Sequence, residues 1–467
     1  MIDAVARSRV SGVRRRRPWS YAIIVVAIAL RVVSPSTAAL SYLVIAAYAL
    51  WGRTNAIQAL ALSWLFTILS PGLMLSGGGA ETSFAAIGRY AVLLGATTAI
   101  FLHKGVALQQ ASKGFVVFTV LLGAAIIAHS LFYSPMPDIS ILKALSWTLA
   151  MMTSIAAWVG LSESQRQDLS RDLFWGLVIV LAASLPLAAM PLGYLVNGTG
   201  FQGILNQPQA FGPTMGLLGA WAMSRLLGEV RPPWWLLGVV GATSGCILLS
   251  EARTAGLAMI IGVTLSVLLG SSFSGRSIGR MLPGLRSARV HAALGGVFVA
   301  GVVLAPKIAE VLRHYITKSG RADINGLGEA YQLSRGGVID AMMINVAQHP
   351  FTGIGFGIAS VPELMVVSRD PVFGLPVGAS IEKGVLPLMV LEELGALGVV
   401  CVGFWELTLL QGASRGGLAP LAVCLTALLL NMGEATLFSP GGFGLLQLVL
   451  LGWAYASGQS MPRRARG

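Results

Sequence analysis

The chain has 467 residues and a formal net charge of +13, with 55% hydrophobic and only 11% charged residues. A soluble domain carries about 25% charged residues, and the mean hydropathy here is +0.76. These values exclude an ordinary soluble enzyme. Long apolar runs recur between short polar breaks, and a segment inside a bilayer must satisfy its own backbone hydrogen bonds. We therefore expect an all-α, polytopic integral membrane protein.

The apolar runs predict about 12 to 14 transmembrane helices, because the first two runs are short and could form one hairpin. In chain order, the predicted helices span residues 20–34, 36–51, 56–75, 84–102, 114–133, 139–161, 173–196, 211–227, 233–250, 254–270, 290–306, 385–410, 418–437 and 441–456.

The basic residues predict the orientation. If the basic tail 1–19 is cytoplasmic and the spans alternate, about two thirds of the 32 Lys and Arg residues fall on the inner side. The basic tail 457–467 is then cytoplasmic as well. This distribution favours a lipid bilayer as the partner of the positive charge and argues against nucleic acid. The predicted parts are these two tails, an N-terminal bundle (20–306), a large extracytoplasmic loop (307–384) and C-terminal transmembrane helices (385–456).

The large loop is the best candidate for a functional region. Residues 335–349 predict an amphipathic helix over the mouth of the bundle, and Pro350 should end it. Glycines at 353, 355 and 357 favour a tight turn with close backbone approach. The apolar positions at helical spacing are Val338, Ile339, Met342, Met343 and Val346.

Several charged residues near the outer face could carry chemistry. Glu251 and Arg253 interrupt two apolar runs, and charges at that depth are costly unless they have a partner or a ligand. Arg253 could reach toward lipid headgroups or hold an anion at the bundle mouth, and Arg335 could be a solvated loop charge or an anion ligand. A second outer loop, 197–213, is rich in Gly, Asn, Gln and Pro.

Two acids lie inside the apolar run that follows the large loop. Glu392 and Glu393 are either structural, paired with an Arg such as Arg89 on a neighbouring helix, or part of a polar cavity. His349 directly precedes a helix-ending proline, so a capping role competes with a catalytic one. The chain has no nucleotide-binding, hydrolase or zinc-protease signature, and we expect neither a metal nor a cofactor.

Four segments resemble the O-antigen ligase and polymerase superfamily of bacterial polysaccharide assembly. The turn 249–256 is similar to the family's Ser-Arg turn, and the segment from Arg335 to the sequence HPFTGIGFG (349–357) resembles its central motif. The run LEELGALG (391–398) is similar to the start of the family's following span, and GILNQPQ (203–209) is a weaker fourth match. Ligases of the family place a His-Asn pair near Gly384, which this chain lacks, so the resemblance leans toward a polymerase.

The resemblance implies a membrane glycosyltransferase of the bacterial inner membrane. It would take a glycan from a polyprenyl-diphosphate-linked donor and pass it to a glycan acceptor at the outer face, in company with other polysaccharide-assembly proteins. We expect a metal-independent transfer that inverts the anomeric centre. Cations would bind the diphosphate, and a base would take the acceptor proton. The expected diphosphate ligands are Arg253, Arg335, Lys383, Arg321 and Arg89, and the candidate bases are Glu382, Glu251 and His349.

Two other classes remain open from the sequence. A lipid-linked oligosaccharide flippase or another multi-span transporter would share this composition, although it would need polar residues near the middle of several spans. A structural scaffold of the same assembly would tolerate point changes at the arginines.

Overall fold

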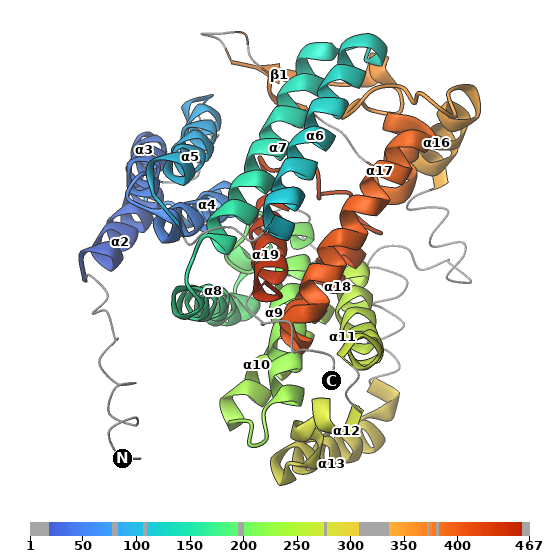
Figure 1. The fold of residues 1–467 in the computed structure, drawn as a ribbon. Helices are drawn as coiled ribbons and strands as arrows, with labels where there is room; N and C mark the ends of the chain where they lie inside the picture. The colour runs from blue at the N-terminus through green and yellow to red at the C-terminus, as the bar shows by residue number, and fades with distance from the viewer. Residues whose placement is uncertain are drawn as a thin grey trace, which may run out of the picture.

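The computed structural model describes residues 18–76, 83–105, 110–194, 200–274, 278–307, 336–370, 374, 376–379 and 383–459. Helices dominate these residues (Figure 1). The α-helices are α2 (Pro18–Val33), α3 (Pro35–Ala49), α4 (Arg53–Ile68), α5 (Ser83–Leu102), α6 (Gln110–Tyr133), α7 (Pro137–Val159), α8 (Glu163–Ser184), α9 (Pro208–Gly228), α10 (Trp234–Leu249), α11 (Arg253–Ser274), α12 (Ile278–Met281), α13 (Ala288–Val303), α16 (Gly337–Gln348), α17 (Leu386–Gly416), α18 (Leu418–Leu430) and α19 (Gly444–Ser457).

The expectation of an all-α membrane protein is confirmed. Within the ranges that the structure describes, five helices are long and apolar enough to cross a membrane, namely those at Ser112–Tyr133, Pro137–Val159, Glu163–Ala189, Arg253–Ser272 and Leu386–Gly416. Several shorter apolar helices accompany them. A helix overlaps each of the predicted apolar runs, because the apolar length that fills a bilayer is also a run of good helix formers.

The boundaries differ from the predicted ones where proline or capping decides them. The helix expected from residue 173 begins at Glu163, where Ser162 and Gln165 form a capping box. It ends at Ser184 and gives way to 3-10 turns at Leu185–Ala189 and Pro191–Tyr194, since proline lacks the backbone N–H that would continue it. The predicted loop 197–213 is wrong at its end, because α9 already begins at Pro208.

The helices form two groups around α7. Helices α2, α3, α4 and α5 pack on one another, and α4 and α5 also contact α7. On the other side, α19 packs against α7, α17 and α18, while α9 packs against α10, α11 and α18 (Figure 1). The indole N–H of Trp158 donates to the carbonyl of Val449 at 3.0 Å, which joins α7 to α19. The bundle core is therefore built from both halves of the chain.

The described part of the large loop packs at one end of this bundle. It contains α16, a 3-10 turn at Pro362–Leu364, and an antiparallel hairpin of β1 (Val367–Arg369) and β2 (Pro376–Ala379). Arg369 on β1 pairs with Asp138 at the start of α7 at 2.6 Å. These elements lie at the end opposite α12 and α13 (Figure 1).

The expected helix of the loop is present, but its apolar residues do not all face the protein. Val338 and Met342 pack inward. Met343 is 51% exposed and Ile344 is 59% exposed. The helix ends at Gln348, with His349 as its C-cap, so Pro350 follows the end as predicted.

Candidate functional site

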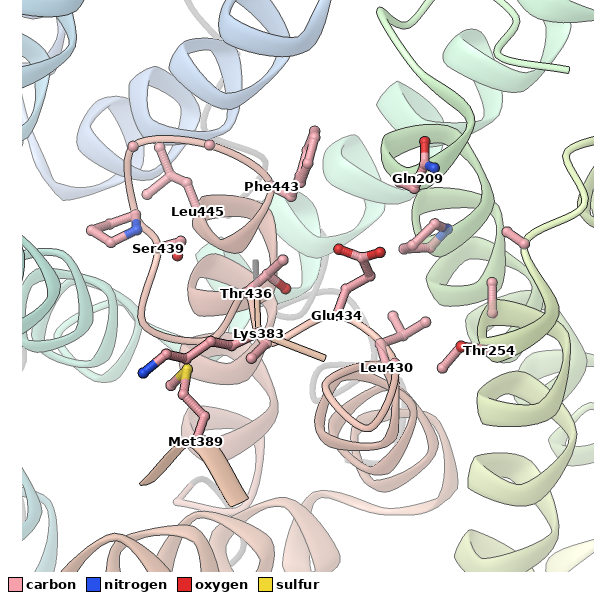
Figure 2. A pocket seen from close by; sticks show the side chains of 18 of the residues that line it. Gln209, Thr254, Lys383, Met389, Leu430, Glu434, Thr436, Ser439, Phe443 and Leu445 are labelled. Carbon is pink, nitrogen blue, oxygen red and sulfur yellow. The ribbon is translucent and has the colours of Figure 1, made fainter. Parts of the chain in front are cut away.

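A cavity of about 1160 Å³ opens at the end of the bundle that carries the loop hairpin. Its walls come from α4, α5, α7, α9, the α10–α11 turn, β2, Lys383 and the segment 429–445. The alternating topology predicted from the sequence places the ends of these segments on one face of the membrane. Their convergence on a single cavity agrees with that alternation (Figure 2).

The cavity wall combines apolar side chains with polar ones and with charges of both signs. Four basic residues line it, Arg89, Lys143, Arg253 and Lys383, and two acids do, Glu251 and Glu434. A ligand with an anionic head and an apolar tail matches such a wall, because the cations bind the charge while Leu, Ile, Met and Pro side chains bury the tail.

The α10–α11 turn holds Arg253 in place through backbone geometry. Glu251 adopts a left-handed φ of 54°, which for a residue other than glycine costs roughly 1–3 kcal/mol and persists only where neighbours enforce it. Here the N–H of Phe201 donates to Leu249 at 2.8 Å. A Cβ at Gly212 on α9 would collide with Ala252. The close packing of α9 thus enforces the turn that presents Glu251 and Arg253 to the cavity.

Lys383 lines the cavity, but its ammonium belongs to a buried ion-pair cluster. Its Nζ lies 2.7 Å from Glu392 and 3.0 Å from Glu393, and all three side chains are at most 1% exposed. Asn345 on α16 donates to Glu392 at 2.7 Å, and the N–H of Gly357 donates to Glu393 at 2.7 Å. The acids are therefore structural, which is one of the two roles that the sequence left open for them. Their cationic partner is Lys383, so the suggested pairing with Arg89 is wrong.

This cluster joins the glycine-rich segment 349–357 to the run 391–398 at the start of α17. The glycine-rich loop docks on the first turns of α17 through Ile354 N–H to the Glu392 carbonyl at 2.9 Å and Gly355 N–H to the Glu393 carbonyl at 3.1 Å. Gly395 interrupts α17 with a φ of 67° and ψ of −172°. A Cβ there would collide with the carbonyl of Phe351, so the close approach requires glycine.

Lys143 is a cavity cation that the sequence did not single out. It lies on α7 behind Gly357, and its Nζ is 5.4 Å from the ring centre of Phe356. Among the described residues, no side chain or carbonyl accepts a hydrogen bond from this ammonium, and no carboxylate forms an ion pair with it. The sequence did contain a signal for this residue, because a lone lysine inside an apolar run is costly without a function. The candidates predicted from the sequence were charges near the ends of the apolar runs, so Lys143 was not among them.

A second feature missed by sequence reasoning is the loop between α18 and α19, here called the 431–443 loop. Glu434, Thr436, Ser439 and Phe443 of this loop face the cavity (Figure 2). Arg89 on α5 donates to the carbonyl of Gly441 at 2.8 Å. The loop therefore forms one wall and fixes a cation on the neighbouring wall.

The expected site residues fall into three groups. Arg253, Arg89, Glu251 and Lys383 line the cavity, although Lys383 is engaged by Glu392 and Glu393. His349 is exposed at the end of α16, where it is the C-cap residue, and it is not among the described residues that line the cavity, so its candidacy as the base stays a prediction. Arg335, Arg321 and Glu382 lie outside the described residues, and the convergence of Arg335 with Arg253 stays a prediction.

No model of a known protein family matches the chain, and no curated protein matches it either.

Proposed function

We propose that the chain is a membrane glycosyltransferase that moves a glycan from a polyprenyl diphosphate to an acceptor sugar. The transfer would polymerise, or ligate, lipid-linked repeat units into O-antigen or exopolysaccharide at the outer face of the bacterial inner membrane. The single observation that carries the proposal is the cavity, whose wall combines four cations with apolar surface. An isoprenoid diphosphate has that combination of a charged head and an apolar tail.

In this proposal the cavity cations stabilise the leaving group. Negative charge develops on the diphosphate as its bond to the sugar breaks, and guanidinium and ammonium groups bind that charge more strongly as it grows. Arg253, Arg89 and Lys143 take this role, and Arg335 and Arg321 remain candidates for it. Lys383 does not, because two glutamates already neutralise it. The donor is activated, so the transfer proceeds in one inverting displacement without a cofactor or a metal.

The proposed topology has about 12 to 14 spans, with both termini in the cytoplasm and the cavity facing outward. The support is the agreement between helix alternation and the meeting of the cavity segments at one end of the bundle. The loop 307–384 would then be extracytoplasmic, where the acceptor glycan and other polysaccharide-assembly proteins are found.

The deciding experiment is a transfer assay with purified full-length protein in lipid nanodiscs. The probe is the polyprenyl-diphosphate oligosaccharide extracted from bacterial cells that lack the gene for this chain. A ladder of products indicates a polymerase, and a single transfer to a lipid core indicates a ligase. If no product forms while vesicles show movement of the lipid-linked glycan between leaflets, the chain is a flippase and the proposal fails.

Cavity variants make the assay specific. Losing one charged hydrogen bond to the diphosphate costs about 1.5–3 kcal/mol, or roughly 10- to 100-fold in binding. We expect Lys143→Ala and Arg253→Ala each to weaken binding of undecaprenyl diphosphate by about that factor and to slow transfer. Lys113→Ala is the matched control, because Lys113 is exposed at the start of α6, away from the cavity. Equal binding by all three variants would contradict the diphosphate site.

A further inference from the structure

A group of exposed arginines lies at the end of the bundle opposite the cavity, where α12 and α13 are found (Figure 1). The arginines come from two stretches of the chain. One is the link between α9 and α10, and the other contains α12, a 3-10 turn at Pro283–Arg286 and the start of α13. This group, here called the arginine patch, consists of Arg231, Arg280, Arg286 and Arg289.

Two contacts hold the two stretches against each other. A Cβ at Gly284 would lie 2.0 Å from the carbonyl oxygen of Leu226, so the 3-10 turn packs directly on the last turn of α9. The guanidinium of Arg289 donates to the carbonyl of Pro232 at 3.1 Å. Because Pro232 directly follows Arg231 in the chain, these contacts bring an arginine of each stretch to the same place.

The remaining two arginines are close to each other within the second stretch. A Cβ at Gly279, the residue before Arg280, would lie 3.4 Å from Nη2 of Arg286. The patch thus consists of two neighbouring pairs, Arg231 with Arg289 and Arg280 with Arg286. The short 3-10 turn and the start of α13 connect the two pairs.

The positive charge of the patch is not neutralised within it. Glu229 is the one acid in residues 226–235 and 278–291, and it pairs with Arg225 on α9 at 3.0 Å. Among the residues that the structure describes, no carboxylate lies within ion-pair distance of a patch arginine. Like charges that are held together in this way repel one another, so an anion stabilises the patch.

Large apolar side chains border the patch. Val230 directly precedes Arg231 and is 68% exposed. Leu285 directly precedes Arg286 and is 42% exposed. Trp234 is exposed as well, and tryptophan is enriched where lipid headgroups meet acyl chains. A soluble anion would leave these apolar side chains in water, whereas a lipid also covers them.

We propose that the arginine patch binds the phosphate groups of anionic phospholipids in the leaflet opposite the cavity. Guanidinium groups bind phosphate oxygens through paired, charge-assisted hydrogen bonds, and the acyl chains cover Val230, Leu285 and Trp234. The cation of a zwitterionic headgroup is repelled by the same arginines, so the patch selects anionic lipids. The inference is independent of the glycosyl transfer, because the patch and the cavity share no residue.

The test uses full-length protein in phosphatidylcholine nanodiscs that contain a trace of photoreactive phosphatidylglycerol, with a diazirine at the headgroup end of one acyl chain. Mass spectrometry of the crosslinked peptides locates the adducts. Each arginine near a membrane surface contributes roughly fivefold to the binding of anionic lipid. We therefore expect adducts in residues 226–235 and 278–291 at about 25 times the yield of phosphatidylcholine with the same diazirine.

The double variant Arg231→Gln with Arg280→Gln should lower the phosphatidylglycerol yield in these segments at least about tenfold. Neither side chain donates a hydrogen bond to another described residue, so the variant should fold. Arg171→Gln with Arg415→Gln is the matched control, because both arginines are exposed and their loss removes the same charge outside the patch. Its yield should stay within about twofold of the wild type.

Equal yields of the two lipids on the wild type, or adducts only in other segments, overturn the inference without any variant. An equal loss in the patch variant and in the control overturns it too, because the effect is then one of total charge. Inorganic phosphate should lower the adducts no more than chloride does at the same ionic strength. If it lowers them more, the patch binds the free ion and the lipid is the wrong ligand.

Discussion

At the scale of single residues, Lys383 shows how burial determines the role of a charge. Its position just before a predicted helix makes Lys383 a candidate diphosphate ligand from the sequence, and the residue does line the cavity. Its ammonium, however, lies within 3.0 Å of two carboxylates that have no exposed surface. Removing one member of such a cluster leaves uncompensated charge in a low-dielectric environment.

We predict that Lys383→Met destabilises the protein by about 3–5 kcal/mol, the usual cost of breaking a buried ion pair. A denaturant titration in detergent, which follows the unfolding of each variant, measures this loss of stability. The triple variant Lys383→Met with Glu392→Gln and Glu393→Gln should recover most of the loss, because no charge is left unpaired. If Lys383→Met keeps wild-type stability but loses undecaprenyl diphosphate binding, Lys383 is a ligand and its structural role is wrong.

At the scale of elements, the start of α17 and the glycine-rich loop form one unit. The kink at Gly395 exposes the backbone of α17 to the loop, and Ala396 N–H donates to the Pro350 carbonyl at 2.9 Å. Gly353 packs against the Glu393 backbone, where a Cβ would lie 2.5 Å from the carbonyl carbon. Backbone-to-backbone contact of this kind leaves no flexible side chain that could yield to a larger residue.

Two glycines of α17 provide a matched pair for this unit. Gly395→Ala forces a methyl group into the Phe351 carbonyl at a left-handed φ, so we expect a loss of a few kcal/mol and release of the loop. Gly403→Ala meets nothing within 4 Å and should be neutral or more stable by up to about 1 kcal/mol. Thermal unfolding and limited proteolysis of the loop measure both effects. Similar unfolding temperatures for the two variants would contradict the role given to Gly395.

The helical elements were largely predictable, because the thickness of the bilayer sets the length of the apolar run that a spanning helix needs. The predicted start of α8 was ten residues too late, because the first turns of this helix are polar and do not continue the apolar run. The capping box of Ser162 and Gln165 was the sequence signal for the true start. The site was predictable where charge interrupts an apolar run, as at Glu251 and Arg253. Lys143 and the 431–443 loop were not, because their proximity to those residues depends on contacts between helices far apart in sequence.

At the scale of the whole molecule, the proposed alternation of the helices predicts which surfaces share a side of the membrane. The loop segment with Leu364, which is 76% exposed, lies at the cavity end of the bundle. Ser164, at the start of α8, is exposed on a segment that the alternation assigns to the opposite side. These two positions therefore report orientation without touching the cavity wall.

We predict that a membrane-impermeant maleimide labels Leu364→Cys in intact spheroplasts and labels Ser164→Cys only after permeabilisation. Cys401 is exposed and is replaced by Ser in both variants, whereas Cys246 and Cys424 are buried. The proposed orientation requires this order because basic residues stay on the cytoplasmic side. The reverse labelling pattern would place the cavity in the cytoplasm, and labelling of both positions in spheroplasts would contradict the alternation.

The cavity wall draws on α4 and α5 near one end of the sequence and on residues 429–445 near the other. During synthesis, α4 and α5 are therefore made long before the segment between α18 and α19 that completes the cavity. Until then Arg89 lacks the Gly441 carbonyl that holds it. A nascent chain stalled before α18 would consequently have an incomplete cavity, because one wall and the carbonyl that binds Arg89 both come from the segment still to be made.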